Sequence, residues 1–340
     1  MKVLKLIAVV GLACLLAQPG VADVRKSGLT GAAFLKVGVG ARPVALGSAY
    51  TTVAGDVHQL FWNPAGAALS GGESQVLLSH NSWIADLSHD AIGFARDMGD
   101  MGTLGIGIVT LGLSDIAADR DLVPQFVLDA GTFEPNDTET SDTYSYRDLA
   151  VGATWARNIT DRLNLGVTGK IVSQTIDGVS ATAYAADFGA LYRVNSTYTI
   201  GARINNLGSD LTFYDIGAPL PLIFSIGAAA AILDAPDSGM KVTLLADATK
   251  PQDAEQLVYA AAEVELFDML SLRSGYKYNY QGVEDEKVDE VSGAVVPAGR
   301  SEEGLTAGLG LELSMATVDY AFTSFGILDS VHQFSFQFRF

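Results

Sequence analysis

The sequence predicts an all-β fold, a 14-stranded antiparallel transmembrane β-barrel with a short, partly helical plug at its N-terminus. Three observations support this fold. From Glu73 onward, apolar and polar residues alternate in segments of about ten residues, the length of a membrane-spanning strand. The connections between these segments alternate between short and long, and the chain ends in FSFQFRF. In water that ending would be an exposed apolar edge strand prone to aggregation, whereas in a bilayer its phenylalanines face lipid.

The first 22 residues have the three parts of a secretory signal peptide. Two lysines supply positive charge, residues 6–17 are apolar, and residues 20–22 are small, so we expect the mature chain to start at Asp23. The apolar run is too short to cross a bilayer comfortably as a helix. The one cysteine, Cys14, lies within it. Acylation of Cys14, as in a lipoprotein, is an alternative that the residues before it fit poorly.

Residues 23–72 are rich in glycine and alanine and lack strand alternation. An eight-stranded barrel is filled by its own side chains, whereas one of roughly 16 to 18 strands encloses an aqueous channel. A barrel of fourteen strands falls between these, so an unfilled lumen would leak. We therefore expect residues 23–72 to form several short helices that plug the barrel.

Two motifs in this segment are candidate plug or hatch elements. Asn63 suits a helix N-cap and Pro64 the first helical position. The run Trp62-Asn63-Pro64-Ala65-Gly66 is therefore interpreted as a helix start packed in the lumen or, alternatively, as a hatch that moves when a ligand binds. Arg42, followed by Pro43, is expected to anchor the plug through a carboxylate of the barrel wall.

Residues 73–340 form the predicted barrel. Its expected strands are 73–81, 88–97, 102–113, 144–157, 162–174, 181–193, 197–207, 220–232, 240–250, 257–266, 269–281, 304–313, 315–324 and 330–340. The connections before the fourth and twelfth strands are long, and those after the fourth, sixth and tenth are short. Short turns and long loops therefore fall on opposite sides, and an even strand count puts both ends of the barrel on the periplasmic side.

Aromatic residues near the strand ends fit two interfacial girdles. The outer girdle would contain Tyr144, Tyr146, Tyr184, Tyr278 and Tyr280, and the inner one Trp155, Tyr192 and Tyr198. In the last strand, Phe334, Phe336, Phe338 and Phe340 are expected to face lipid. This ending resembles the C-terminal signature by which outer-membrane barrels are recognised for insertion. It predicts the bacterial outer membrane as the location, with its lipid and the barrel-insertion machinery as partners.

The lumen face of the predicted strands carries charges of both signs. The cations are Lys170, Arg193, Arg203, Arg273, Lys277 and Arg339, and the anions are Asp187, Asp247, Glu263, Glu265, Glu312 and Asp319. We favour a structural network of ion pairs that fills the lumen, and a selectivity-setting channel lining is the alternative. The acidic stretches 114–143 and 282–303 are interpreted mainly as solvated outer loops, with binding of divalent cations or of a basic partner as the alternative.

The remaining composition excludes several classes of function. A net charge of -18 argues against nucleic acid as a partner, because phosphate binding needs clustered Lys and Arg. The four histidines lack metal-ligand spacing, and neither a complete dinucleotide-binding loop nor a G-x-S-x-G element is present. A hydrolase site around His80 and His89 is a minor alternative. We therefore expect no enzyme activity, no metal and no cofactor.

The segment GAAFLKVGVGARPVALGSAYTTVAGD, followed by FWNPAG, resembles the N-terminal signature of the PorV/PorQ family, a branch of the FadL-like outer-membrane barrels. The likeness continues through DFGALYRV, GARINNLG and LSLRSGYKY to the closing strands. It implies a binding and shuttle role in type IX protein secretion, with secreted cargo domains and other type IX components as partners. The alternative that it implies is FadL-like passage of hydrophobic small molecules through a plugged barrel, with such a molecule as ligand.

Overall fold

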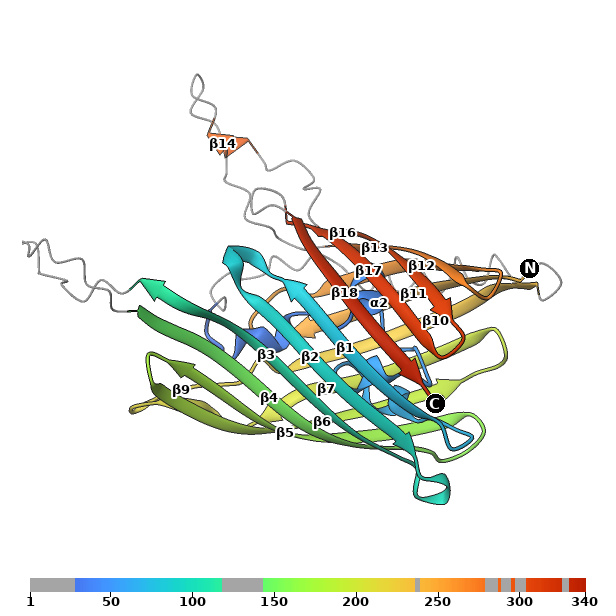
Figure 1. The fold of residues 1–340 in the computed structure, drawn as a ribbon, viewed down its shortest axis with the longest axis horizontal. Coiled ribbons are helices and arrows are strands. Elements are labelled where there is room, and N and C mark those ends of the chain that lie inside the picture. The colour runs from blue at the N-terminus through green and yellow to red at the C-terminus, as the bar shows by residue number, and fades with distance from the viewer. Residues whose placement is uncertain are drawn as a thin grey trace, which may run out of the picture.

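The chain forms one closed antiparallel barrel (Figure 1). The computed structural model describes residues 28–117, 143–235, 239–278, 287–288, 295–296, 304–325 and 330–340. Within these residues the fourteen barrel strands are β1 (Ser74–Ser82), β2 (Ser88–Asp97), β3 (Thr103–Ala117), β4 (Thr143–Asn158), β5 (Leu163–Ile176), β6 (Val179–Arg193), β7 (Tyr198–Gly208), β10 (Ile223–Ala235), β11 (Met240–Pro251), β12 (Leu257–Leu266), β13 (Leu270–Tyr278), β16 (Leu305–Leu313), β17 (Ala316–Ser324) and β18 (Ser330–Arg339). The predicted fold class is confirmed. The proposed signal peptide lies outside the described residues.

The barrel closes where its last strand pairs with its first. β18 runs antiparallel to β1, with Arg339 opposite Gln75 and Phe334 opposite His80. The other neighbours follow in sequence order around the barrel, each pair antiparallel. The C-terminal strand therefore completes the hydrogen bonding that would otherwise leave two open edges.

The outer face of the barrel is apolar. Phe334, Phe336 and Phe338 are 42–45% exposed, whereas the alternating Ser335 and Gln337 are at most 1% exposed. The same alternation holds along β4 and β16. Such a band of exposed apolar side chains suits the hydrocarbon layer of a bilayer. Among the described residues, no helix is long and apolar enough to cross a membrane.

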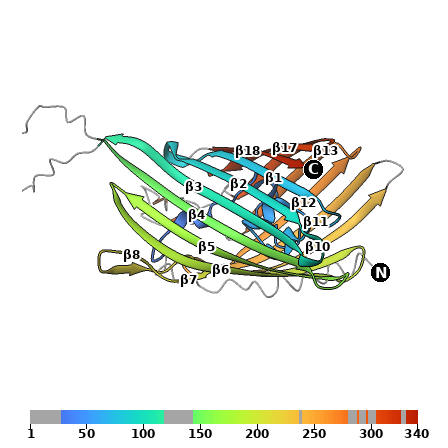
Figure 2. The same cartoon turned by 60° about the horizontal axis from the view of Figure 1, so that its bottom comes forward.

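The two ends of the barrel differ. We call the end that holds Ser74 and Arg339 the short-turn end. The opposite end holds the connections after β3, β7 and β13, and we call it the long-loop end. The long-loop end lies to the left in Figures 1 and 2. A small hairpin, β8 (Leu211–Phe213) and β9 (Ile216–Ala218), extends the barrel there (Figure 2). β14 (Lys287–Val288) and β15 (Val295–Val296) pair within the connection after β13. The connections after β1, β5, β11 and β17 at this end are as short as those at the other end, so the predicted contrast in length rests on the connections after β3, β7 and β13.

The plug precedes β1, and from residue 28 onward it contains four short helices, η2 (Ala33–Lys36), α2 (Ala41–Ala45), η3 (Val57–Leu60) and η4 (Pro64–Ala67). Its first residues lie toward the long-loop end, where the amide of Gly31 donates to the carbonyl of Pro219. Its last helix contacts β4, β5 and β6 inside the barrel. Asn63 caps η4 by accepting from the amide of Ala65 at 3.2 Å.

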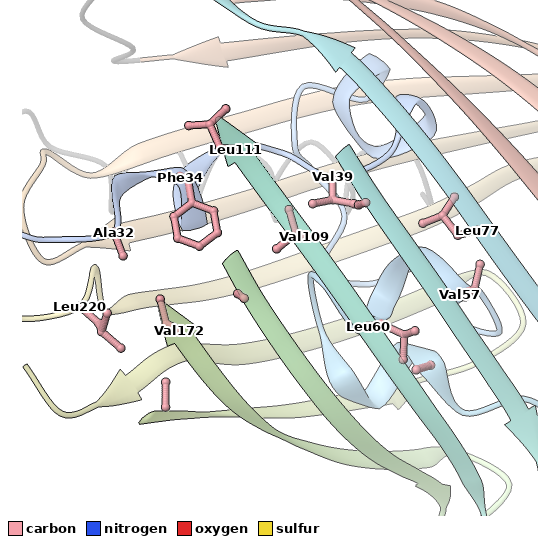
Figure 3. Packing of buried hydrophobic residues seen from close by; sticks show 14 of the residues in the cluster. Ala32, Phe34, Val39, Val57, Leu60, Leu77, Val109, Leu111, Val172 and Leu220 are labelled. Carbon is pink, nitrogen blue, oxygen red and sulfur yellow. The ribbon is translucent and has the colours of Figure 1, made fainter. Parts of the chain in front are cut away.

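Apolar packing joins the plug to one side of the wall. Phe34, Val39 and Leu60 of the plug belong to a buried cluster that includes Val109 and Val172 of the barrel (Figure 3). Burial of such side chains is the main favourable term that keeps the plug inside the lumen.

Wall glycines bring the plug backbone close to the strands. A Cβ at Gly166 would overlap the carbonyl group of Pro64, and one at Gly189 would overlap the side-chain oxygen of Asn63. On the opposite side, a Cβ at Gly275 would overlap the backbone at Gly47. These positions need glycine because the plug backbone occupies the space of a side chain.

Candidate functional site

Arg42 links the plug to the barrel wall. Its guanidinium donates to both carboxylate oxygens of Glu263 on β12, at 3.0 and 2.9 Å, and to Asp56 of the plug at 2.9 Å. Glu263 also accepts from Arg273 on β13 at 2.7 Å, and Arg273 reaches Asp319 on β17 at 2.5 Å. Bidentate contacts of this kind are the strong form of an ion pair, so the chain of charges fixes α2 against three strands.

Asp56 is the centre of the plug half of this network. Its carboxylate accepts from the hydroxyl of Tyr50 at 2.7 Å and from the backbone amide of His58 at 2.8 Å, and it lies 2.6 Å from Nδ1 of His58. Burial alone would raise the pKa of Asp56, but His58 and Arg42 outweigh burial and hold this pKa well below its usual range. Asp56 is therefore ionised in the folded protein.

Acid is expected to loosen the plug progressively once the pH falls below the ordinary pKa of a carboxyl group. Because the folded pKa of Asp56 is lowered, its stabilisation is complete above the unfolded value of about 3.9 and is lost as the pH falls through the folded value. Hydrogen exchange of the amides of residues 57–67, corrected for intrinsic rates, should stay slow down to about pH 5 and accelerate below about pH 4. Asp56→Asn should weaken this acid response, with the remainder due to Glu263, which also binds Arg42; an equal response in that variant would contradict the assignment.

Further polar contacts hold the rest of the plug. Arg203 on β7 donates to the hydroxyl of Thr51 at 3.1 Å and to the carbonyl of Trp62 at 3.3 Å, and its guanidinium lies 5.3 Å from the ring centre of Trp62. Asp247 accepts from the amide of Thr51 at 2.9 Å. Thr51 thus contacts both Arg203 and Asp247 of the wall, and the ring of Trp62 makes a cation–π contact with Arg203.

The predicted lumen charges fall into three groups. The first group consists of buried ion pairs between wall residues. It contains the cluster of Arg273, Glu263 and Asp319, which reaches Arg42, and the separate pair of Lys170 and Asp187 at 2.8 Å. Arg203 and Asp247 contact the plug. Arg339 pairs with Glu312 at 3.1 Å and Glu265 with Lys241 at 3.5 Å in more exposed positions, Arg193 is exposed at the end of β6, and Lys277 lines a cavity. The structure therefore brings part of the predicted set together and leaves the rest near the barrel ends.

A cavity of about 480 Å³ separates the start of the plug from the wall. Phe34, Val37, Val39 and Phe61 of the plug line it, with wall residues that include Leu111 and, near the long-loop end, Trp83, Leu257 and Phe325. Most of its lining is apolar, and its volume is in the range of roughly 300 to 1,000 Å³ found for small-molecule sites. A smaller cavity, lined partly by the same plug residues, lies next to β3 and β4.

Sequence reasoning missed several residues of this region. Tyr146 was expected in the lipid-facing girdle, but it lies on the inward row of β4, hydrogen-bonds to Asp148 and lines the cavity. That placement was wrong because strand parity decides the face: Trp155 faces outward, so residue 146, an odd number of positions away, faces inward. The sequence analysis assigned no site role to Tyr50, Asp56 or the buried His58. The sequence offered one signal, the acid Asp56 two residues before His58, but their contact with Arg42 is visible only in the fold.

The comparisons with known proteins identify the fold. The toluene transporter TodX of P. putida matches with a TM-score of 0.53 and 14% identity, over 89% of this chain and 96% of that chain. The deltaS2S3 mutant of the TodX monoaromatic hydrocarbon channel matches with a TM-score of 0.54 and 14% identity, over 89% and 98%. Identity this low shows a shared fold and not a shared ligand. No curated protein matches the chain.

The family comparison gives a different family from the one suggested by the N-terminal motif. Membership of PorV/PorQ stays a prediction, whereas the model of the uncharacterised protein family UPF0164 matches residues 16–229. Because that match spans more than half of the 340 residues, the chain belongs to the uncharacterised protein family UPF0164, and its barrel has the fold of the TodX channel.

Proposed function

We propose that the protein lies in the bacterial outer membrane and passes hydrophobic small molecules through its plugged barrel. The observation that carries this proposal is the largely apolar cavity between η2 and the wall, close to the long-loop end. An apolar recess with few polar groups favours ligands that leave water readily. TodX, whose fold this barrel shares, is a hydrocarbon channel, and the proposal extends that ligand class to this chain.

Passage would require part of the plug to move out of the path through the lumen. Below the cavity, Arg42, Asp56 and Glu263 tie α2 to the wall, and η4 fills the space next to β5 and β6. A ligand in the cavity contacts Val39 and Phe61, which belong to the same segment as these anchors. The proposed function is therefore ligand entry from the long-loop end followed by displacement of part of the plug. The secretion role implied by the PorV/PorQ resemblance stays a prediction.

Uptake of radiolabelled toluene by cells that express the protein tests this function. Val37 faces the cavity, so Val37→Trp should fill it and reduce uptake to the level of cells that lack the protein. Val151→Trp is the matched control, because Val151 lies on the outer face of β4 and is 37% exposed. Uptake that is the same with and without the wild-type protein would refute the proposal.

A further inference from the structure

The cavity has a polar wall as well as an apolar one. Asn81 of β1, Gln333 of β18 and Thr323 of β17 line it at the seam where the barrel closes. Their exposed fractions are 1%, 1% and 4%, so all three side chains are buried. Phe34 and Val37 of the plug line the same cavity and supply its apolar surface. A ligand there would meet both kinds of surface.

The register places these polar side chains together. Asn81 lies directly opposite Gln333 in the β1–β18 pair, and opposite His89 in the β1–β2 pair. Thr323 lies opposite Val331, which is two residues from Gln333 along the same face of β18 and also lines the cavity. Directly paired residues on one face of a sheet have Cβ atoms about 5 Å apart. One small ligand group can therefore reach several of them.

Several atoms of this wall have unused hydrogen-bonding capacity. Within the described part of the chain, Asn81 Oδ1, Gln333 Oε1 and Thr323 Oγ1 have no hydrogen-bond partner. The ring nitrogens of His89, which lies opposite Asn81 but does not line the cavity, have none either. Buried polar side chains in folded proteins nearly always have partners. A group of unpartnered ones around a cavity therefore points to a ligand that supplies the missing bonds.

The orientation of Gln333 decides which bond is missing. Its Nε2 donates to the carbonyl of Gly38 at 3.3 Å and lies 3.1 Å from the hydroxyl of Ser79. Because a carbonyl only accepts, this contact fixes the amide with Oε1 as a free acceptor. A ligand group that bonds to Gln333 Oε1 must therefore donate, which a hydroxyl does and an ionised carboxylate or a hydrocarbon does not. Thr323 Oγ1 can accept from or donate to the same hydroxyl.

We propose that the cavity selects neutral hydrophobic molecules that carry a hydroxyl group, such as phenols and aromatic alcohols, over hydrocarbons of the same shape. This inference rests on the proposed function and specifies its substrate class. Three cations line the cavity, namely Lys36, Arg203 and Lys277. Lys36 is paired with Asp253 at 2.7 Å, and Arg203 is held by Thr51 and by the carbonyl of Trp62. An anionic ligand would have to compete with Asp253 for Lys36, and the test below therefore includes a carboxylate.

The test compares p-cresol, p-xylene and 4-methylbenzoate, which share a para-methyl ring and differ in one group. Equilibrium dialysis of each radiolabelled ligand against the full-length protein in detergent, with empty micelles subtracted, gives the three dissociation constants. Wild type should bind p-cresol more tightly than either of the others. The double variant Asn81→Leu/Thr323→Val should lower the preference for p-cresol over p-xylene about tenfold, since a net hydrogen bond contributes up to about that factor.

Two further variants separate the ligand contact from effects on folding. Gln333→Met keeps the length of the side chain and should also lower the preference for p-cresol. Thr317→Val makes the same change as Thr323→Val on the same inward row of β17, but Thr317 lies away from the cavity, so the preference should not change. Binding of p-xylene by each variant shows that the cavity is intact.

The outcomes distinguish this inference from the proposed function. If p-xylene binds but p-cresol binds no tighter, if the preference survives in both cavity variants, or if 4-methylbenzoate binds most tightly, the hydroxyl selection is refuted and hydrophobic passage stands. If none of the three ligands binds and toluene uptake is absent, both are refuted.

Discussion

Arg42→Met is expected to release the plug from the barrel wall. The substitution leaves His58 as the only basic neighbour of Asp56 among the described contacts and removes one of the two cations on Glu263, whereas both carboxylates stay buried. Removal of one partner from a buried ion pair typically costs about 3 to 5 kcal/mol, because the remaining charge is left uncompensated. The substitution should destabilise the closed position of the plug relative to open positions, because Arg42 and Asp56 are plug residues and Glu263 belongs to the wall.

Hydrogen exchange of the amides in η3 and η4 measures this opening. The expected cost corresponds to a rate increase of roughly two to four orders of magnitude in those amides. Arg42→Lys keeps the charge but not the fork that reaches both carboxylates, so its effect should be intermediate. Lys241→Met is the control, because Lys241 is 47% exposed and exposed pairs contribute about 1 kcal/mol or less. Equal exchange in Arg42→Met and wild type would show that Arg42 does not hold the plug.

The barrel was predictable because its information is local. The alternation of Phe334 with Ser335 fixes the two faces of β18, and the same rule applied strand by strand gave all fourteen strands and the closing pair. The position of Asn63 before Pro64 was enough to indicate the start of η4. Each of these inferences uses residues that are neighbours in the sequence.

The site was less predictable because its contacts join distant parts of the chain. Arg42 and Glu263 are 221 residues apart, and the sequence shows only that a plug cation would find some wall carboxylate. The cavity depends on Phe34 and Val37 lying opposite β1 and β18, and no local pattern encodes that pairing. The sequence also does not show which plug residues contact the glycines of the strands, because Gly166 and Pro64 are distant along the chain.

The wall glycines give the sharpest test of how the plug fits. Gly166→Ala is expected to displace η4, because the new methyl group would overlap the carbonyl group of Pro64, and a backbone group cannot swing aside as a side chain can. Insertion of a methyl group into a filled interior costs typically about 1 to 3 kcal/mol. Gly189→Ala should act on the same helix by displacing the side chain of Asn63 that caps it.

Gly169→Ala is the matched control for this effect. Gly169 lies on the same strand as Gly166 but on the outer face, where a Cβ would meet no atom within 4 Å, and neither glycine has a positive φ. The control should change the opening free energy of the plug by less than about 0.5 kcal/mol, as ordinary surface substitutions do. Faster exchange in η4 for Gly166→Ala but not for Gly169→Ala would show that contact with the plug, and not strand curvature, requires glycine at residue 166. Equal exchange in the two variants would contradict this, because both changes affect the curvature of β5 alike and only one reaches the plug.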